Sequence, residues 1–264
     1  MKINSRRLMA ALTLSLLLLS AGVASAQETN ALNIESMRRA ESDTDSKRFD
    51  SLYGQAMRVI RTKPADAEAL LLEALKLKSE FIVPTYAQKE LATLYLSQKK
   101  YRSSIRMYEA VFKSGLRWGG SEEPKILADF ADALMGVGEI KRATDALNAA
   151  IKSPNGSKSN YAITGFDEER VPTVAEVRST IHLVRGIHYN WDFQLEQAKS
   201  ELMSAIRLVP QSGLAHYQLG RYYEEVDKIA EATTEYEKAM RFGSDEVRLL
   251  AEKQRNSIAP PKKP

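Results

Sequence analysis

Small and apolar side chains recur along this chain with a helical spacing that repeats as a larger unit. Seven pairs of identical residues are separated by 34 positions, namely His182 and His216, Gly186 and Gly220, Tyr189 and Tyr223, Ala198 and Ala232, Glu201 and Glu235, Ala205 and Ala239, Arg207 and Arg241. A unit of 34 residues accommodates two short helices and a turn, and it needs stacked neighbours to bury its apolar face. The pattern predicts an all-α array of helix hairpins.

The same template continues toward the N-terminus. It places a small residue in the first helix, an aromatic residue or Leu three positions later, and a small residue twelve positions later, and it starts at Ala92, Ala131, Gly186 and Gly220. A further unit, with helices near 47–62 and 64–77, places Gln55 in the small-residue position, and its register is uncertain by one residue. We predict an α-solenoid of about five hairpins over 47–245, closed by a capping helix over 246–258.

Two spacings interrupt the period. Five extra residues fall around 116–120, and 21 extra residues separate the third and fourth secure units. The longer insertion, 153–173, opens with a turn signal at Pro154-Asn155-Gly156 and carries Tyr161, Ile163 and Phe166. Insertions in repeat arrays often emerge on the binding face.

The template resembles the tetratricopeptide repeat (TPR) family. Its nearest full match is Leu219-Gly220 with Tyr223, Ala232, Tyr236 and Ala239, and the resemblance covers about 47–245. It implies a non-enzymatic scaffold that binds a peptide or helix of a protein partner in a concave groove. The motif identifies an architecture rather than a chemistry, because function depends on the surface carried by the fold.

The positions that face away from the core on each first helix are the ones that this resemblance assigns to the groove. From them we predict partner contacts by Tyr86, Lys89, Leu96, Lys125, Leu183, Ile187, Asn190, Trp191, Leu214, Tyr217 and Arg221. Trp191 is the expected anchor, because large aromatic residues dominate many interfaces. The alternative, that Tyr161, Ile163 and Phe166 fill the groove from within, stays open.

The two ends of the chain are predicted to lie outside the fold. A basic start, an apolar run and Ala24-Ser25-Ala26 make 1–26 a signal peptide cleaved before Gln27, in preference to an uncleaved anchor. The segment 27–46 is polar, and 259–264 is a disordered Pro/Lys tail. We predict a soluble periplasmic protein, with secretion as the alternative. The chain has no Cys, which excludes lipoprotein anchoring and thiolate metal sites.

Composition narrows the function class. The formal net charge of +4 falls to +1 when Lys2, Arg6 and Arg7 leave with the signal, so we expect no nucleic acid partner and no stable membrane insertion after cleavage. His182 and His216 are predicted to pack inside the repeats, and His188 and Asp192 have the spacing of a surface contact. We expect no catalytic residue, no cofactor and no metal site.

These observations favour a scaffold or adaptor in a cell-envelope assembly such as pilus, secretion, polysaccharide-export or outer-membrane machinery. The partner is expected to be an envelope protein. The alternative functions are a regulatory or stabilising subunit of a cell-wall-modifying enzyme, or an enzyme that uses the insertion as a lid.

Overall fold

A computed structural model describes residues 43–77, 83–118, 122–152 and 172–258, and these residues form helices and connecting turns without a strand. The chain divides into two compact units, Met1–Pro84 and Thr85–Pro264. The predicted signal peptide, most of the polar N-terminal segment, the insertion up to residue 171 and the C-terminal tail lie outside the described residues. The bounded helices are α2 (Pro64–Ala74), α3 (Val83–Ser97), α4 (Tyr101–Lys113), α5 (Glu122–Gly136), α6 (Ile140–Lys152), α8 (Val174–Trp191), α9 (Leu195–Leu208), α10 (Gly213–Glu225), α11 (Ile229–Phe242) and α12 (Asp245–Ile258).

The first unit contains one helix hairpin, made by a helix over 43–59 and by α2. Phe49 and Ala56 are fully buried on the first helix, as are Ala67 and Leu71 on α2. Gln55, which the template placed in the small-residue position, is exposed. The small buried residue is therefore Ala56, one position later, and this settles the uncertain register.

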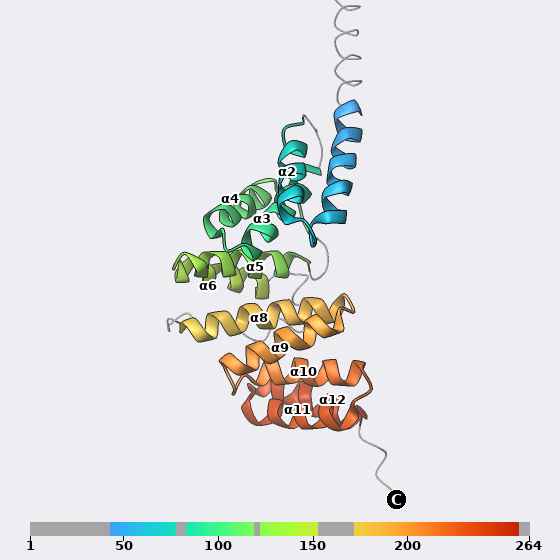
Figure 1. Cartoon of the computed structure of the whole chain (residues 1–264). Helices are drawn as coiled ribbons and strands as arrows, with labels where there is room; N and C mark the ends of the chain where they lie inside the picture. Colours follow the sequence, from blue (N-terminus) through green and yellow to red (C-terminus); the bar gives the residue numbers. More distant parts are fainter. Residues whose placement is uncertain (1–42, 78–82, 119–121, 153–171, 259–264) are drawn as a thin grey trace, which may run out of the picture. The chain divides into compact units, whose positions relative to one another are not determined.

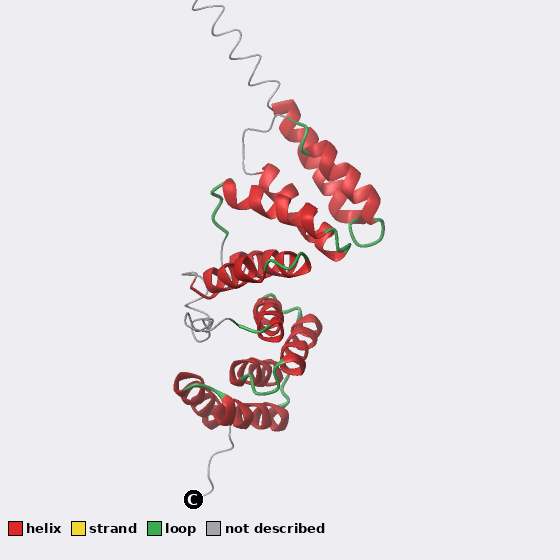
Figure 2. Cartoon of the chain, turned by 90° about the vertical axis from the view of Figure 1, so that its left-hand side faces the viewer, coloured by secondary structure: helices red, strands yellow, loops and turns green. Residues whose placement is uncertain are grey.

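The second unit is a row of helix hairpins (Figures 1 and 2). Within the hairpins α5 packs on α6, α8 on α9, and α10 on α11. Successive hairpins meet through α4 and α5, α5 and α8, and α9 and α10. One continuous cluster of buried apolar side chains extends from Ala92 to Ala251. The predicted all-α repeat architecture is confirmed.

The small residues of the template permit close helix packing. A Cβ atom added at Gly186 would lie 2.8 Å from the side chain of Leu202, and one added at Gly220 would lie 2.7 Å from the ring of Tyr236. Real Cβ contacts are longer, so in the α8–α9 and α10–α11 hairpins the second helix packs this closely on the first only because a glycine leaves space.

The last hairpin is covered by α12, which packs on α10 and α11 and buries Val247 and Ala251. This confirms the predicted capping helix.

The N-terminus of α8, which follows the long insertion, is capped by Thr173. The Thr173 hydroxyl accepts a hydrogen bond from the Glu176 amide, and the Glu176 carboxylate accepts one from the Thr173 amide. None of the helices in the described ranges has the length and apolar character needed to span a membrane.

Candidate protein-interaction site

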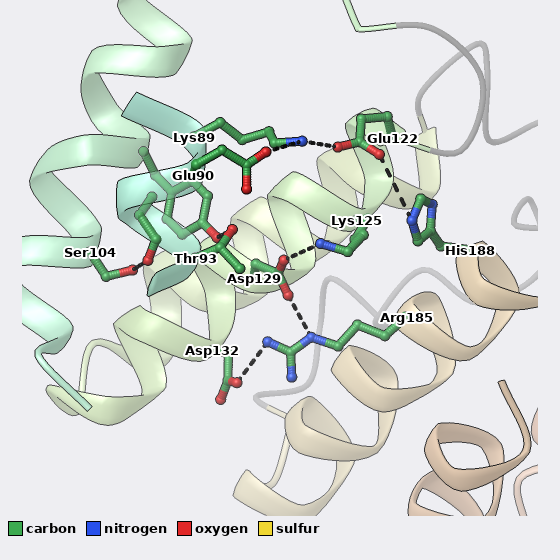
Figure 3. A network of polar contacts seen from close by, with 12 residues as sticks. Lys89, Glu90, Thr93, Ser104, Glu122, Lys125, Asp129, Asp132, Arg185 and His188 are labelled. Carbon is green, nitrogen blue, oxygen red and sulfur yellow. Dashed lines mark hydrogen bonds and ion pairs between the residues drawn. The ribbon is translucent and has the colours of Figure 1, made fainter. Parts of the chain in front are cut away.

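A cluster of charged side chains joins the first helices of three hairpins, α3, α5 and α8 (Figure 3). Asp129 on α5 lies at its centre, where one carboxylate oxygen accepts from Lys125 Nζ at 2.8 Å and the other from Arg185 Nε at 2.6 Å. A second guanidinium nitrogen of Arg185 donates to Asp132 at 2.8 Å. Arg185 therefore ties α8 to α5 by two separate carboxylates.

Burial and charge pairing together set the ionisation of this cluster. Burial alone would raise the pKa of Asp129, but the charges of Lys125 and Arg185 and their hydrogen bonds outweigh it and lower the pKa to about 2. Burial would also lower the pKa of Lys125, yet Asp129 holds it above its ordinary value. Both groups are charged at neutral pH and neutralise each other. Lys125, a predicted partner contact, is therefore already engaged within the protein.

Lys89 is engaged in the same way at the other end of the cluster. Its Nζ donates to Glu122 at 2.7 Å and lies 3.2 Å from Glu90 and 5.4 Å from the ring centroid of Trp118. The ring of Tyr86 meets Trp118 edge-on, with 5.0 Å between centroids. Trp118 belongs to the five extra residues between α4 and α5, so this short insertion packs against two predicted contact residues.

The expectation of an open apolar groove is wrong for four residues. Leu183 and Ile187 on α8 and Leu214 and Tyr217 on α10 are buried, with 2% to 4% of their surface exposed. The helical wheel divides a helix into two faces, whereas α8 packs against α5, α6, α9 and α10. Neighbours on several sides therefore bury more of its circumference than one face.

The remaining predicted contacts differ in exposure. Leu96 is partly buried against the apolar core, and Arg221 is also partly buried. The Oδ1 atom of Asn190 is buried, and within the described parts of the chain it has no hydrogen-bond partner. Trp191, the expected anchor, is 50% exposed at the end of α8.

The turn that follows Trp191 exposes a second aromatic residue. Phe193 is 74% exposed, the highest value among the large apolar side chains of the described residues that are exposed. Asp192 between them is 43% exposed at its side chain, and one of its oxygens lies 3.3 Å from His188 Nε2. We call Trp191, Asp192 and Phe193 the aromatic turn. It presents two rings and a carboxylate to solvent.

The backbone at Phe193 is left-handed, with φ of 55°. The same place in the other hairpin turns of this unit is also left-handed, at Lys99, Gly138 and Asp227. Each turn has the hydrogen bonds of a Schellman motif; in the aromatic turn, the Gln194 amide donates to the Tyr189 carbonyl at 2.9 Å and the Phe193 amide to the Asn190 carbonyl at 3.2 Å. This position favours Gly or Asn, so a Phe there is unusual.

The histidines have structural partners. His182 Nδ1 lies 2.6 Å from Glu201, and His216 Nδ1 lies 2.6 Å from Glu235, so the 34-residue period repeats a polar contact between the two helices of a hairpin. His216 is thus packed within its repeat, as predicted, whereas the side chain of His182 is 32% exposed. His188 does approach Asp192, but the ring is 3% exposed, and burial lowers its pKa. The predicted surface contact is therefore a buried one.

Sequence reasoning missed Asp129, Arg185 and Phe193. Arg185 occupies a core-facing position of the template that other repeats fill with apolar residues, and a charge there signals a buried partner. Phe193 lies seven residues after Gly186, where the other repeats place Lys99, Gly138 and Asp227. A large aromatic residue at a position otherwise given to polar residues and Gly was the available signal.

Within the described ranges, no group of three or more His, Cys, Asp or Glu side chains is arranged to hold a metal ion. No protein-family model matches the chain. No curated protein matches it either.

Among solved structures, the chain is similar to MamA from Desulfovibrio magneticus RS-1, with 16% identity over 74% of this chain and 94% of that one, at a TM-score of 0.36. It is also similar to YrrB, described as a TPR protein with an unusual peptide-binding site, with 16% identity over 78% and 90% of the two chains and a TM-score of 0.36. A third match is TTC0263, a thermophilic TPR protein from Thermus thermophilus, with 15% identity over 80% and 98% and a TM-score of 0.36.

The geometry of the chain identifies the architecture. Paired helices and left-handed turns at the same template position recur through the second unit, with a small residue, Gly or Ala, at the close contact between the two helices of a hairpin. The fold is a TPR-like array of helix hairpins. Its charged cluster is internally neutralised. Among the predicted contacts, Tyr86 is 39% exposed and Trp191 is 50% exposed, and Trp191 lies beside the still more exposed Phe193 in the aromatic turn.

Proposed function

We propose that this TPR-like chain is a non-enzymatic protein-binding scaffold or adaptor, and that the aromatic turn is its contact surface. The observation that carries the proposal is the exposure of Trp191 and Phe193 at one turn, with Phe193 held in a backbone conformation that disfavours it. Unfavourable backbone conformations persist where function retains them. This surface is smaller than the groove predicted from the sequence, because much of that groove is buried or ion-paired.

Trp191 is 50% exposed and Phe193 is 74% exposed, so burial of their rings by a partner can supply the binding free energy that a protein contact needs. Aromatic side chains bury about 150–250 Å² each, and apolar burial contributes about 25 cal/mol per Å². Trp is among the residues that dominate interface energies. Phe193 and Trp191 therefore suit the anchor role, with Asp192 supplying a charge for orientation.

The proposal is tested by crosslinking in cells that make the protein. A photoreactive residue in place of Trp191 is expected to capture one defined protein surface, identified by mass spectrometry. The matched control replaces Leu249 on α12, which is 66% exposed and apolar but lies away from the turn. Capture from position 191 and not from 249 supports the proposal, whereas equal capture from both, or from neither, counts against it.

We further propose that the scaffold works in the cell envelope, in assemblies of the pilus, secretion, polysaccharide-export or outer-membrane type. The support is the sequence of residues 1–26, with its basic start, apolar run and small residues before Gln27. Export by this route delivers the mature chain to the periplasm.

The intact mass of the protein recovered from cell fractions tests export. Cleavage before Gln27 and recovery in the periplasmic fraction are expected. As a control, replacing Ala24 and Ala26 by Lys removes the small residues that cleavage needs and should leave the longer chain in the membrane fraction. A full-length product in the cytoplasm would contradict the envelope proposal while leaving the protein-binding proposal standing.

A further inference from the structure

A groove of about 540 Å³ runs along α10 between α9 and α11. Its floor is one face of α10, where His216, Leu219 and Tyr223 are spaced by three and four residues. Met203 on the α9 wall is 48% exposed. The volume lies within the range of sites that enclose ligand groups, about 300–1,000 Å³. The groove therefore has space and apolar surface for aromatic side chains.

The groove carries positive charge at its walls. Arg207 on α9 has a hydrogen bond to Ser204 at 3.0 Å, and in the described parts of the chain it has no carboxylate partner. On the opposite wall Lys238 donates to Glu235 at 2.7 Å, and Glu235 also meets His216. Glu235 thus contacts both Lys238 and His216, whereas Arg207 has no carboxylate partner among the described residues and can pair with an incoming anion. The chemistry that fits is an aromatic group next to a carboxylate.

We propose that this groove binds the aromatic turn of a second copy of the chain. Trp191 and Phe193 supply the rings, and Asp192 between them supplies the carboxylate that faces Arg207. The inference rests on the proposed function, because it names the partner of the same exposed turn. It explains two features together: exposed rings on one part of the second unit, and on another part an apolar groove whose cation, Arg207, has no carboxylate partner among the described residues.

The aromatic turn precedes α9 and the groove is lined by α9, so each of two copies can insert its turn into the groove of the other. Phe193 lies two residues before α9 begins, and Met203 lies eight residues after that start, about 12 Å along the helix. A reciprocal pair, in which each copy gives its turn and receives the other, closes as a dimer. A few aromatic side chains make a small interface, so the association is expected to be weak and concentration-dependent.

Sedimentation equilibrium of the purified chain over a concentration series tests the inference. The wild type is expected to form dimers, and Phe193→Ser and Met203→Glu are each expected to weaken association by at least about tenfold. Mixing the two variants restores one contact per pair, because one retains the turn and the other the groove. Leu249→Ser, a matched loss of an exposed apolar side chain, is expected to dimerise like the wild type.

A charge exchange tests the pairing of Asp192 with Arg207. Asp192→Arg and Arg207→Asp are each expected to weaken the dimer by about tenfold, and the double variant is expected to recover most of the loss. Circular dichroism confirms that each variant is folded. If the single variants lost dimerisation because their fold was damaged, the double variant would not recover it. Recovery in the double variant therefore indicates a contact between copies.

The outcomes separate this inference from the proposed function. A wild-type chain that stays monomeric at all concentrations, or a dimer unaffected by Phe193→Ser and Met203→Glu, overturns the second-copy inference. In that case capture of a different protein from position 191 in cells leaves the scaffold proposal intact. Crosslinks from position 191 to α9–α11 of another copy support both proposals.

Discussion

Phe193 is the residue at which local backbone preference and side-chain chemistry disagree most clearly. A left-handed conformation costs an L-residue about 1–2 kcal/mol, and such a conformation persists only where interactions of the surrounding structure offset the cost. The ring of Phe193 is 74% exposed, so little burial offsets it. At the equivalent turns, Gly138 avoids the cost and Asp227 tolerates it better. On the proposed function, the aromatic identity of residue 193 serves binding rather than folding.

Asp129 is the opposite case, a charged residue whose position the fold does explain. Its carboxylate is 6% exposed, and both oxygens meet a cation. A buried charge without partners is very unfavourable, and paired charges with complete hydrogen bonds are tolerated. Arg185 is tolerated at a core-facing position for the same reason, because its charge is paired with Asp129 and Asp132.

At the level of elements, α5 and α8 are joined by this ion network in addition to apolar contacts. The network crosses the junction that bears the 21-residue insertion in the sequence. An insertion lengthens the connection between two hairpins, and fixed contacts between their first helices preserve the stacking. We infer that Arg185 and Asp129 fix the packing of α8 against α5.

Removing the central carboxylate should destabilise the protein strongly. Asp129→Ala leaves Lys125 and Arg185 buried beside fewer anions, and breaking a buried ion pair in this way costs about 3–5 kcal/mol. Asp132→Ala is the matched control, because Asp132 is 36% exposed and Arg185 retains Asp129. Urea unfolding should show a clearly smaller loss in the free energy of unfolding for Asp132→Ala than for Asp129→Ala. Equal losses would mean that the stability of the network does not depend on the buried Asp129.

The same network predicts the response to acid. The pKa of Asp129 is lowered to about 2 in the folded protein, against about 3.9 in an unfolded chain. Because the folded pKa is the lower one, this contribution to stability is complete above pH about 4 and is lost as pH falls toward about 2. Urea unfolding between pH about 5 and 3 should show this loss in the wild type. Asp129→Asn should be less stable at neutral pH and should lack this part of the pH dependence.

For the whole molecule, the sequence predicted the architecture well because repeat folds place the same side chains at the same positions. Gly186 and Gly220 marked the closest helix contacts, and Val247 and Ala251 marked the capping helix, as found. The register of the first hairpin differed by one residue, at Ala56, because its first helix departs from the template. The spacing of residues along the chain was sufficient to predict the helices and their closest contacts wherever the template was regular.

The candidate site was less predictable because it depends on contacts between repeats. A helical wheel treats one helix at a time, and it placed Leu183 and Ile187 in an open groove although neighbouring helices bury them. It did identify Trp191 as exposed. Phe193 was missed because its significance lies in backbone geometry that recurs at each hairpin turn. The groove along α10 likewise arises only when α9 and α11 flank it.

The account of the aromatic turn implies that function, and not folding, retains Phe193. Its most direct test is the free energy of unfolding of Phe193→Asn, measured in urea beside Lys99→Asn at the equivalent turn. Both substitutions place a residue that tolerates the left-handed backbone, so both are predicted to stabilise the protein by about 1 kcal/mol. A loss of stability in Phe193→Asn, with a gain in Lys99→Asn, would show that the ring supports the fold and would contradict the account.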